Sequence, residues 1–336
     1  MRHLLVLLLV MLWSASAFAQ PRAFSAEVMA TRIDVQFAGA TGTEADAEAV
    51  FAIFRAVDAS ASEWKQGSPL ATVNQQAGAA VPVPDELFAL LQRSVAIAEI
   101  TDGAFDPTWA ALWGLWDFRA ASPRPPDDAE RLARTARIDW RKLVLDPEAR
   151  TARIDDGMVV GLGGIAKGWA LDRSVALLRE RGVTDFVLSA GGQVYAVGNA
   201  ATGRPWNVGI RDPRGAWDDY FAIVSVGGAS VSTSGDYERW FAHEGVRYHH
   251  ILDPRTGLPG RGFRSVTVIS DDATEADALS TALMLLSLED GKRIAKEQQV
   301  EVVWVDAAGG VFRTPGLGSR FMLRHAPLEP TPTSTP

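Results

Sequence analysis

The glycine-rich segment at residues 161–168, GLGGIAKG, constrains the fold of this chain more than any other stretch. It follows an apolar, strand-like run that ends at Val160, and residues 169–181 after it have the apolar spacing of an amphipathic helix. A glycine turn between a strand and a helix lets backbone N–H groups approach a phosphate, whose charge the helix N-terminus favours. The segment therefore indicates a nucleotide or dinucleotide ligand. The local sequence fits equally well a turn that only allows close packing of a strand and a helix.

Two known phosphate-binding fingerprints fit this segment incompletely. Gly161, Gly163 and Ala166 match the alanine variant of the dinucleotide-fold fingerprint. The next predicted strand, however, ends in AGG at residues 190–192 and not in the acidic residue that would hold a ribose. The P-loop pattern fails because Ala166 replaces its second glycine and Gly168 stands where Ser or Thr would hold Mg²⁺.

The N-terminus has the features of a cleavable signal peptide at residues 1–19. Arg2 and His3 precede an apolar run at residues 4–13, too short for an ordinary membrane span, and residues 17–19 match an A-x-A cleavage site. We therefore expect a soluble periplasmic protein with no membrane span after cleavage. The absence of cysteine excludes disulfides, thiolate metal sites, a cysteine nucleophile and an acylated N-terminal cysteine.

The rest of the sequence predicts one α+β domain at residues 20–325, followed by a disordered tail rich in proline and threonine at residues 326–336. Strands and helices mix without regular βαβ alternation, which argues against a doubly wound sheet. A net charge of −8 and the absence of a dense basic run argue against nucleic-acid binding. The predicted helices cover residues 43–57, 84–100, 169–181 and 274–298, the last bent near Gly291, and the predicted strands cover residues 27–37, 185–189, 206–210, 221–226, 263–270 and 300–305.

Asp277 and Thr281 are candidate metal ligands because residues four apart share one helix face. Both offer hard oxygen donors, as Mg²⁺ prefers, and water and phosphate could complete an octahedron. The alternative, favoured by the local sequence, is a capping box in which Thr274 is the N-cap and Asp277 its partner.

His249 and His250 are candidate general bases, since histidine accepts protons near neutral pH. The local sequence favours the alternative of one buried, hydrogen-bonded histidine beside an exposed one. Five aromatic residues could stack on a flavin or adenine ring, although clusters of aromatic side chains mostly belong to the hydrophobic core. These residues are Trp64, Phe105, Trp109, Trp113 and Trp116. The TSGDY segment at residues 233–237 fits a phosphate loop or a tight turn.

The order and spacing of several motifs resemble the ApbE family, the FAD:protein FMN transferases, from about Met29 to about Leu323. The motifs are MAT at residues 29–31, GAFDPT at 103–108, GLGGIAKGWALD at 161–172, AGG at 190–192, TSGDYER at 233–239, HHILDPRTG at 249–257 and ADALST at 276–281. The resemblance implies an ApbE-like, T-fold-like architecture of mixed sheets with packed helices and an FAD site in a cleft between subdomains. It also implies an exported, Mg²⁺-dependent enzyme that splits FAD, attaches FMN to a threonine or serine of a target flavoprotein and releases AMP.

The resemblance further implies roles for individual residues. Asp277 and Thr281 would bind the metal, with Ser280 beside them and the backbone carbonyl of Gly164 completing the protein's ligands. His250, or else His249, would take the proton from the target hydroxyl. The residues that would contact FAD are Met29, Trp64, Ala104, Phe105, Asp106, Gly161, Lys167 and Ile251.

The sequence departs from the family at two positions. The family often has an acidic residue where Gly161 stands and a glycine where Ala30 stands. The first departure puts one FAD contact, to a ribose, in question, with either weaker FAD affinity or a shift from transfer towards hydrolysis as the consequence. Two alternatives therefore stay open, an Mg²⁺-dependent FAD pyrophosphatase that releases FMN and AMP, and a non-catalytic FAD-binding protein, which the Asp277–Thr281 pair argues against.

Overall fold

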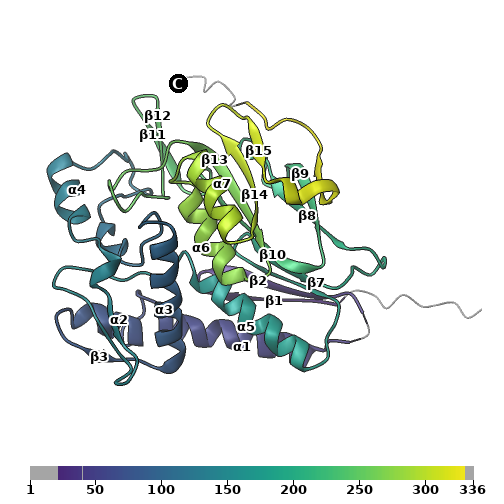
Figure 1. Ribbon diagram of the computed structural model, residues 1–336, viewed down its shortest axis with the longest axis horizontal. Coiled ribbons are helices and arrows are strands. Elements are labelled where there is room, and N and C mark those ends of the chain that lie inside the picture. Colours follow the sequence, from purple (N-terminus) through teal and green to yellow (C-terminus); the bar gives the residue numbers. More distant parts are fainter. Residues whose placement is uncertain (1–21, 40, 330–336) are drawn as a thin grey trace, which may run out of the picture.

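An eight-stranded antiparallel sheet forms the centre of the protein (Figure 1). The computed structural model describes residues 22–39 and 41–329, so the predicted signal peptide lies outside the described residues. In spatial order the strands are β1 (Arg22–Val28), β2 (Thr31–Phe37), β6 (Phe186–Ala190), β7 (Gln193–Val197), β10 (Gly228–Gly235), β13 (Phe263–Ser270), β14 (Glu301–Asp306) and β15 (Val311–Arg313). This arrangement confirms the predicted α+β class of mixed sheets with packed helices.

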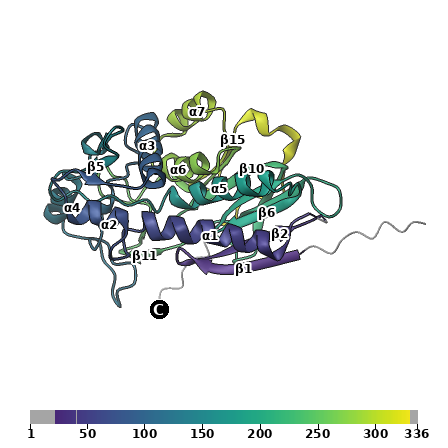
Figure 2. The same cartoon turned by 90° about the horizontal axis from the view of Figure 1, so that it is seen from below.

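Helices cover one face of this sheet and a second, smaller sheet covers the other. Figure 2 shows α1 (Glu44–Ala61), α5 (Ala166–Glu180) and α6 (Ala273–Leu283) on the same side of the strands. The opposite face packs against a sheet of β16 (Phe321–Leu323), β9 (Tyr220–Val226) and β8 (Trp206–Arg211). Because it lies between both layers, β13 is buried at every position.

A mostly helical lobe at residues 61–160 lies beside the sheet and packs against α6 (Figure 1). It contains α2 (Pro69–Gln75), α3 (Asp85–Ile100), α4 (Asp128–Thr135), the turns η1 (Ala110–Leu112) and η2 (Trp140–Lys142), and a small sheet of β3 (Val81–Pro82), β5 (Thr151–Arg153) and β4 (Val144–Asp146). Buried side chains of α3 join those of α6 and β13 in one core. The lobe therefore places its loops next to the start of α5 and the length of α6.

Three predicted elements differ from the structure. The single strand predicted at residues 27–37 is a hairpin, in which Met29 and Ala30 reverse the chain, each with φ 55°. The single helix predicted at residues 274–298 is two helices, because Ser287 caps a separate α7 (Leu288–Glu297) by accepting the N–H of Asp290. The glycine turn predicted at residues 233–237 is wrong for its first part, since residues up to Gly235 belong to β10.

The predicted tail begins in contact with the domain. Leu328 donates its N–H to Asp212 and accepts a hydrogen bond from Arg264 through its carbonyl, at 2.9 and 3.0 Å. Residues 330–336 of that tail lie outside the described residues. Within the described residues, no helix combines the length and the apolar character needed to span a membrane.

Candidate active site

The glycine turn and α6 meet through one buried carboxylate. Asp277 Oδ2 accepts a hydrogen bond of 3.1 Å from the backbone N–H of Gly168, in the first turn of α5. The Lys167 ammonium lies 3.3 Å from Asp277 Oδ2 and 3.4 Å from Oδ1, and it also donates to the Gly163 carbonyl at 3.0 Å. Two segments 110 residues apart therefore form one charged site.

The close approach of α5 to α6 requires a glycine at position 168. A Cβ on Gly168 would lie 2.2 Å from the carbonyl oxygen of Ala273, which is far inside van der Waals contact. Asp172, one turn further along α5, accepts the N–H groups of Ala273 and Thr274, each at 2.8 Å, and so caps α6 from outside. Burial raises the pKa of the Asp172 carboxyl to about 6, against the opposing effect of these hydrogen bonds.

The capping-box interpretation of Asp277 is wrong. The N-cap of α6 is Asp272, whose side chain accepts the N–H of Glu275 at 2.7 Å. Asp277 lies two residues beyond the N3 position, and its carboxylate engages α5 instead of its own backbone. Asp277 therefore does not cap α6, and helix capping does not account for a carboxylate at this position.

Hydroxyl groups gather next to Asp277 on α6. Ser234 Oγ, at the end of β10, lies 2.9 Å from Ser280 Oγ and 3.2 Å from Thr281 Oγ1. Gly164 is close by, since a Cβ there would be 3.7 Å from Thr281 Oγ1. One carboxylate, hydroxyls and a backbone carbonyl are an oxygen donor set that fits Mg²⁺, which uses one or two carboxylates and completes its shell with water and phosphate. Among residues 22–39 and 41–329 no group of three His, Cys, Asp or Glu side chains could hold a metal ion alone.

Two residues of the helical lobe hold the glycine turn in place. The amide of Asn74 forms both backbone hydrogen bonds of Val160, donating to its carbonyl at 2.9 Å and accepting its N–H at 2.8 Å. The indole N–H of Trp109 donates to the Gly161 carbonyl at 3.1 Å. The turn is thus fixed before α5 begins. Ile165, the N-cap of α5, supplies no side-chain acceptor; instead the Leu162 carbonyl accepts the N–H of Ala166, and the Asp277 carboxylate accepts that of Gly168.

The two histidines differ in their surroundings. His249 uses both ring nitrogens internally, with Nε2 2.7 Å from the Gly260 carbonyl and Nδ1 accepting the N–H of Ile251 at 3.2 Å. His250 Nδ1 is buried and has no hydrogen-bond partner in the described part of the chain. Burial, followed by the charges of His249, Arg239 and Lys167, lowers the pKa of His250 to about 4. His250 is therefore neutral at pH 7 and has a ring nitrogen available to accept a proton.

Comparison with known proteins identifies the family of this chain. The ApbE family model matches residues 29–304, which is most of the chain. This chain belongs to the ApbE family. It is 38% identical over 303 residues to the FAD:protein FMN transferase of Treponema pallidum (strain Nichols), an alignment that covers 82% of this chain and 83% of that protein.

Two solved structures are similar to this ApbE protein over nearly their whole length. The ApbE protein of Thermotoga maritima superposes with a TM-score of 0.82 at 32% identity, covering 90% of this chain and 99% of that one. The apo form of the flavinyl transferase ApbE of Pseudomonas stutzeri gives a TM-score of 0.76 at 31% identity, covering 88% and 94%. The chain is therefore a transferase with the ApbE fold.

Three of the residues predicted to contact FAD lie in one buried segment beside the glycine turn. Ala104, Phe105 and Asp106 are buried, and the ring of Phe105 lies 3.5 Å from where a Cβ of Gly164 would be. Asp106 has an internal role, because its carboxylate accepts hydrogen bonds from the backbone N–H groups of Thr108 and Trp140. Burial raises the pKa of this carboxyl despite these bonds.

The other predicted FAD contacts surround the glycine turn in different ways. Met29 is half-buried in the turn of the β1–β2 hairpin and packs against two parts of the core. Ile251 is buried next to His250. Trp64 is 70% exposed and stacks on Trp113, with ring centroids 3.9 Å apart and planes inclined by 22°.

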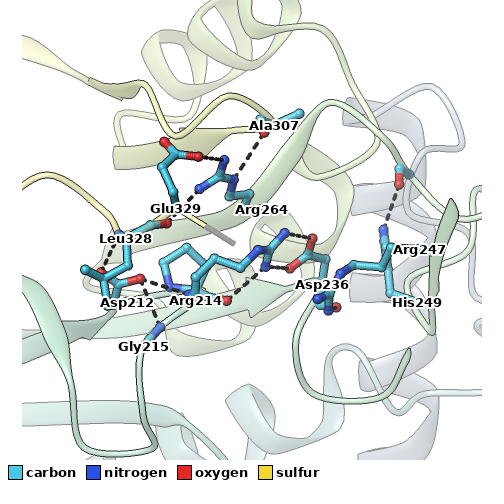
Figure 3. Close-up of polar contacts among 12 residues, drawn as sticks. Asp212, Arg214, Gly215, Asp236, Arg247, His249, Arg264, Ala307, Leu328 and Glu329 are labelled. Carbon is cyan, nitrogen blue, oxygen red and sulfur yellow. Dashed lines mark hydrogen bonds and ion pairs between the residues drawn. The ribbon is translucent and has the colours of Figure 1, made fainter. Parts of the chain in front are cut away.

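Sequence reasoning missed a buried ion pair next to the strand that ends at His249 (Figure 3). Arg214 donates two hydrogen bonds of 2.6 and 2.7 Å to the Asp236 carboxylate, and Arg247 donates to the Asp236 carbonyl at 3.4 Å. Arg247 belongs to β12 (Val246–His249), which pairs with β11 (Trp240–His243) and ends at His249. This pair joins the loop after β8 to the segment that leads into the hairpin. A bidentate arginine–carboxylate pair joins segments distant in sequence, so no local pattern indicates it.

Proposed function

We propose that this ApbE protein transfers the FMN part of FAD to a threonine or serine hydroxyl of a target flavoprotein, with Mg²⁺ as cofactor and AMP as the second product. The observation that carries the proposal is the meeting of Lys167 and Gly168 with Asp277. A diphosphate ligand needs cations and N–H donors on one side and a metal-binding carboxylate on the other, and this contact puts them together. The names of the relatives, FAD:protein FMN transferase and flavinyl transferase, support the same reaction.

The glycine turn would hold the pyrophosphate of FAD in a cleft between the helical lobe and the sheet. The positive end of the α5 helix dipole would favour a phosphate there, and the Lys167 ammonium adds a positive charge. Asp277, Thr281 and the Gly164 carbonyl would hold the Mg²⁺, with Ser280 beside them. Bound there, Mg²⁺ would neutralise negative charge on the pyrophosphate and stabilise the departing AMP.

The transfer step requires a base for the acceptor hydroxyl. The hydroxyl oxygen attacks the phosphorus atom of the FMN half, the bond from this phosphorus to the bridging oxygen breaks, and AMP leaves with the bridging oxygen. The hydroxyl proton passes to a ring nitrogen of His250. His249 is the weaker candidate for this base, because both of its own ring nitrogens are held by the backbone.

The N-terminal sequence supports the periplasm as the place of action. The A-x-A site after a short apolar run supports export and cleavage after residue 19. The mature protein, residues 20–336, would then act in the periplasm on exported flavoproteins. Fractionation of producing cells tests this directly, since cytoplasmic protein with an intact N-terminus contradicts it.

The test of the reaction incubates the purified mature chain with FAD, Mg²⁺ and an acceptor flavoprotein. We expect AMP in solution and an acceptor whose mass has increased by covalently bound FMN. Acceptor without flavin, under conditions in which a known ApbE enzyme loads the same acceptor, contradicts the proposal. AMP and free FMN in the absence of acceptor identify a pyrophosphatase instead, and FAD that stays intact in a stoichiometric complex identifies a binding protein.

A further inference from the structure

A half-buried carboxylate with no function in the reaction above lies at the entrance to the glycine turn. Glu63 Oε1 is 3.3 Å from the position that a Cβ of Gly161 would take, and its carboxylate accepts the backbone N–H of Leu162. The neighbouring cation, Lys65, is already paired with Asp58. Within residues 22–39 and 41–329, no Lys, Arg or His forms an ion pair with Glu63.

A charge in this position is costly without a partner. Burial raises the pKa of the Glu63 carboxyl, so the surrounding protein disfavours the charged form. The single N–H of Leu162 and that of Glu63 itself occupy only part of the capacity of a carboxylate, which has about four acceptor positions. Hydroxyl groups of a ligand would use the remaining positions.

The glycine turn cannot supply a carboxylate of its own at this point. A Cβ on Gly161 would lie 2.9 Å from the Cβ of Ala110 and 3.3 Å from the indole nitrogen of Trp109, so any side chain there would collide with η1 or its flank. The carboxylate of Glu63 lies 3.3 Å from this Cβ position and supplies the negative charge there. Glu63 precedes Trp64, whose exposed ring, stacked on Trp113, is a flat surface for an aromatic ring of a ligand.

We propose that Glu63 binds sugar hydroxyls of FAD, while an aromatic ring of the same half of FAD stacks on Trp64. Acidic residues bind vicinal hydroxyls of nucleotides by accepting two hydrogen bonds. FAD carries such hydroxyls twice, in the ribose of its AMP half and in the ribityl chain of its FMN half. The proposal rests on FAD being the substrate and names a recognition residue for it.

The test compares the wild-type mature chain with Glu63→Gln. Calorimetry in the presence of EDTA measures the affinity of each protein for FAD, AMP and FMN. Glutamine keeps an oxygen that accepts the Leu162 N–H but removes the charge. We expect FAD affinity to fall about tenfold, as for the loss of hydrogen bonds to a charged group. The matched control is Glu48→Gln, which removes an exposed glutamate of α1 and should leave all three affinities unchanged.

The two fragments identify the hydroxyls. Weaker binding of AMP alone assigns Glu63 to the ribose, and weaker binding of FMN alone assigns it to the ribityl chain. Unchanged FAD affinity in Glu63→Gln overturns the proposal. So does an equal loss for AMP and FMN with a lowered unfolding temperature, because Glu63 would then only hold the turn. A wild-type chain that binds no FAD refutes the proposed function itself.

Discussion

The ammonium of Lys167 lies 3.3 Å from the carboxylate of Asp277, although the two residues are 110 positions apart. Lys167 comes from the first turn of α5 and Asp277 from the middle of α6, and both side chains are mostly buried. The contact joins the phosphate-binding and metal-binding halves of the proposed site. Substitutions on its two sides should therefore have different and separable effects.

Asp277→Asn should reduce FMN transfer at least ~100-fold, a loss typical of removing one group that stabilises charge in the transition state. Asparagine keeps an oxygen for the Gly168 N–H, so the fold should be retained while the charge that would bind the metal is lost. The measurement is the rate of covalent flavin incorporation, with thermal unfolding as the check on folding. A variant that transfers FMN at the wild-type rate would exclude Asp277 from the metal site.

Lys167→Met should raise the affinity for a divalent cation in the absence of FAD by about tenfold. The ammonium and the cation compete for the same carboxylate, and a neutral side chain removes this competition at a partly screened site. Mn²⁺ binding followed by electron paramagnetic resonance measures this directly. Lys65→Met, which breaks an exposed ion pair, is the control and should not change Mn²⁺ affinity. An unchanged value in Lys167→Met would place the metal elsewhere.

Gly168→Ala should lower the free energy of unfolding by about 1–3 kcal/mol, as expected for overpacking. The added methyl group would collide with the backbone of Ala273, and backbone cannot rotate away as a side chain can. The same change should reduce transfer, because α6 would move relative to the glycine turn. Gly163→Ala is the matched control within the same turn, since a Cβ there meets no atom within 4 Å. Equal stability of the two variants in urea would refute the argument.

The sequence was sufficient to predict elements whose signals are local. The helix predicted at residues 84–100 is α3, and Thr43, predicted to start the first helix, is the N-cap of α1. Both follow from apolar spacing and end signals that lie within a few residues of each other. The pairing of the glycine segment with the ADALST helix was predicted through a family resemblance, not through any local rule.

The features that sequence reasoning missed depend on distant partners or on rare backbone conformations. Asn74 acts on Val160, 86 residues away, and Glu63 lies against Gly161, which is likewise distant from it in the sequence. The hairpin at Met29 and Ala30 has positive φ at two non-glycine residues, which no propensity favours. The Ser287 cap, in contrast, was a local signal, since Asp290 follows at the N3 position of a capping motif.

His250 should give the enzyme a characteristic dependence on pH. Its pKa in the folded protein is about 4, against about 6.5 for an unperturbed histidine, so the imidazole is neutral, as the proposed base must be, at all pH values well above 4. Transfer should fall as pH decreases through about 4, and His250→Gln should lose about 100-fold or more at pH 7 because the base is absent. The stability effect has a definite sign. Between pH 6.5 and 4 the unfolded chain binds the additional proton, so this residue's contribution is full above pH 6.5 and is lost as pH falls towards 4.

The same variant separates that contribution from those of the other titrating groups. Urea unfolding at pH 7.5 and pH 5 should show a larger loss of stability on acidification for the wild type than for His250→Gln, because glutamine does not titrate. His249→Gln is the neighbouring comparison, and it should destabilise the protein at both pH values, since the ring of His249 bonds to the Gly260 carbonyl and the Ile251 N–H. If His250→Gln keeps wild-type transfer while His249→Gln abolishes it in folded protein, the roles of the two histidines are reversed.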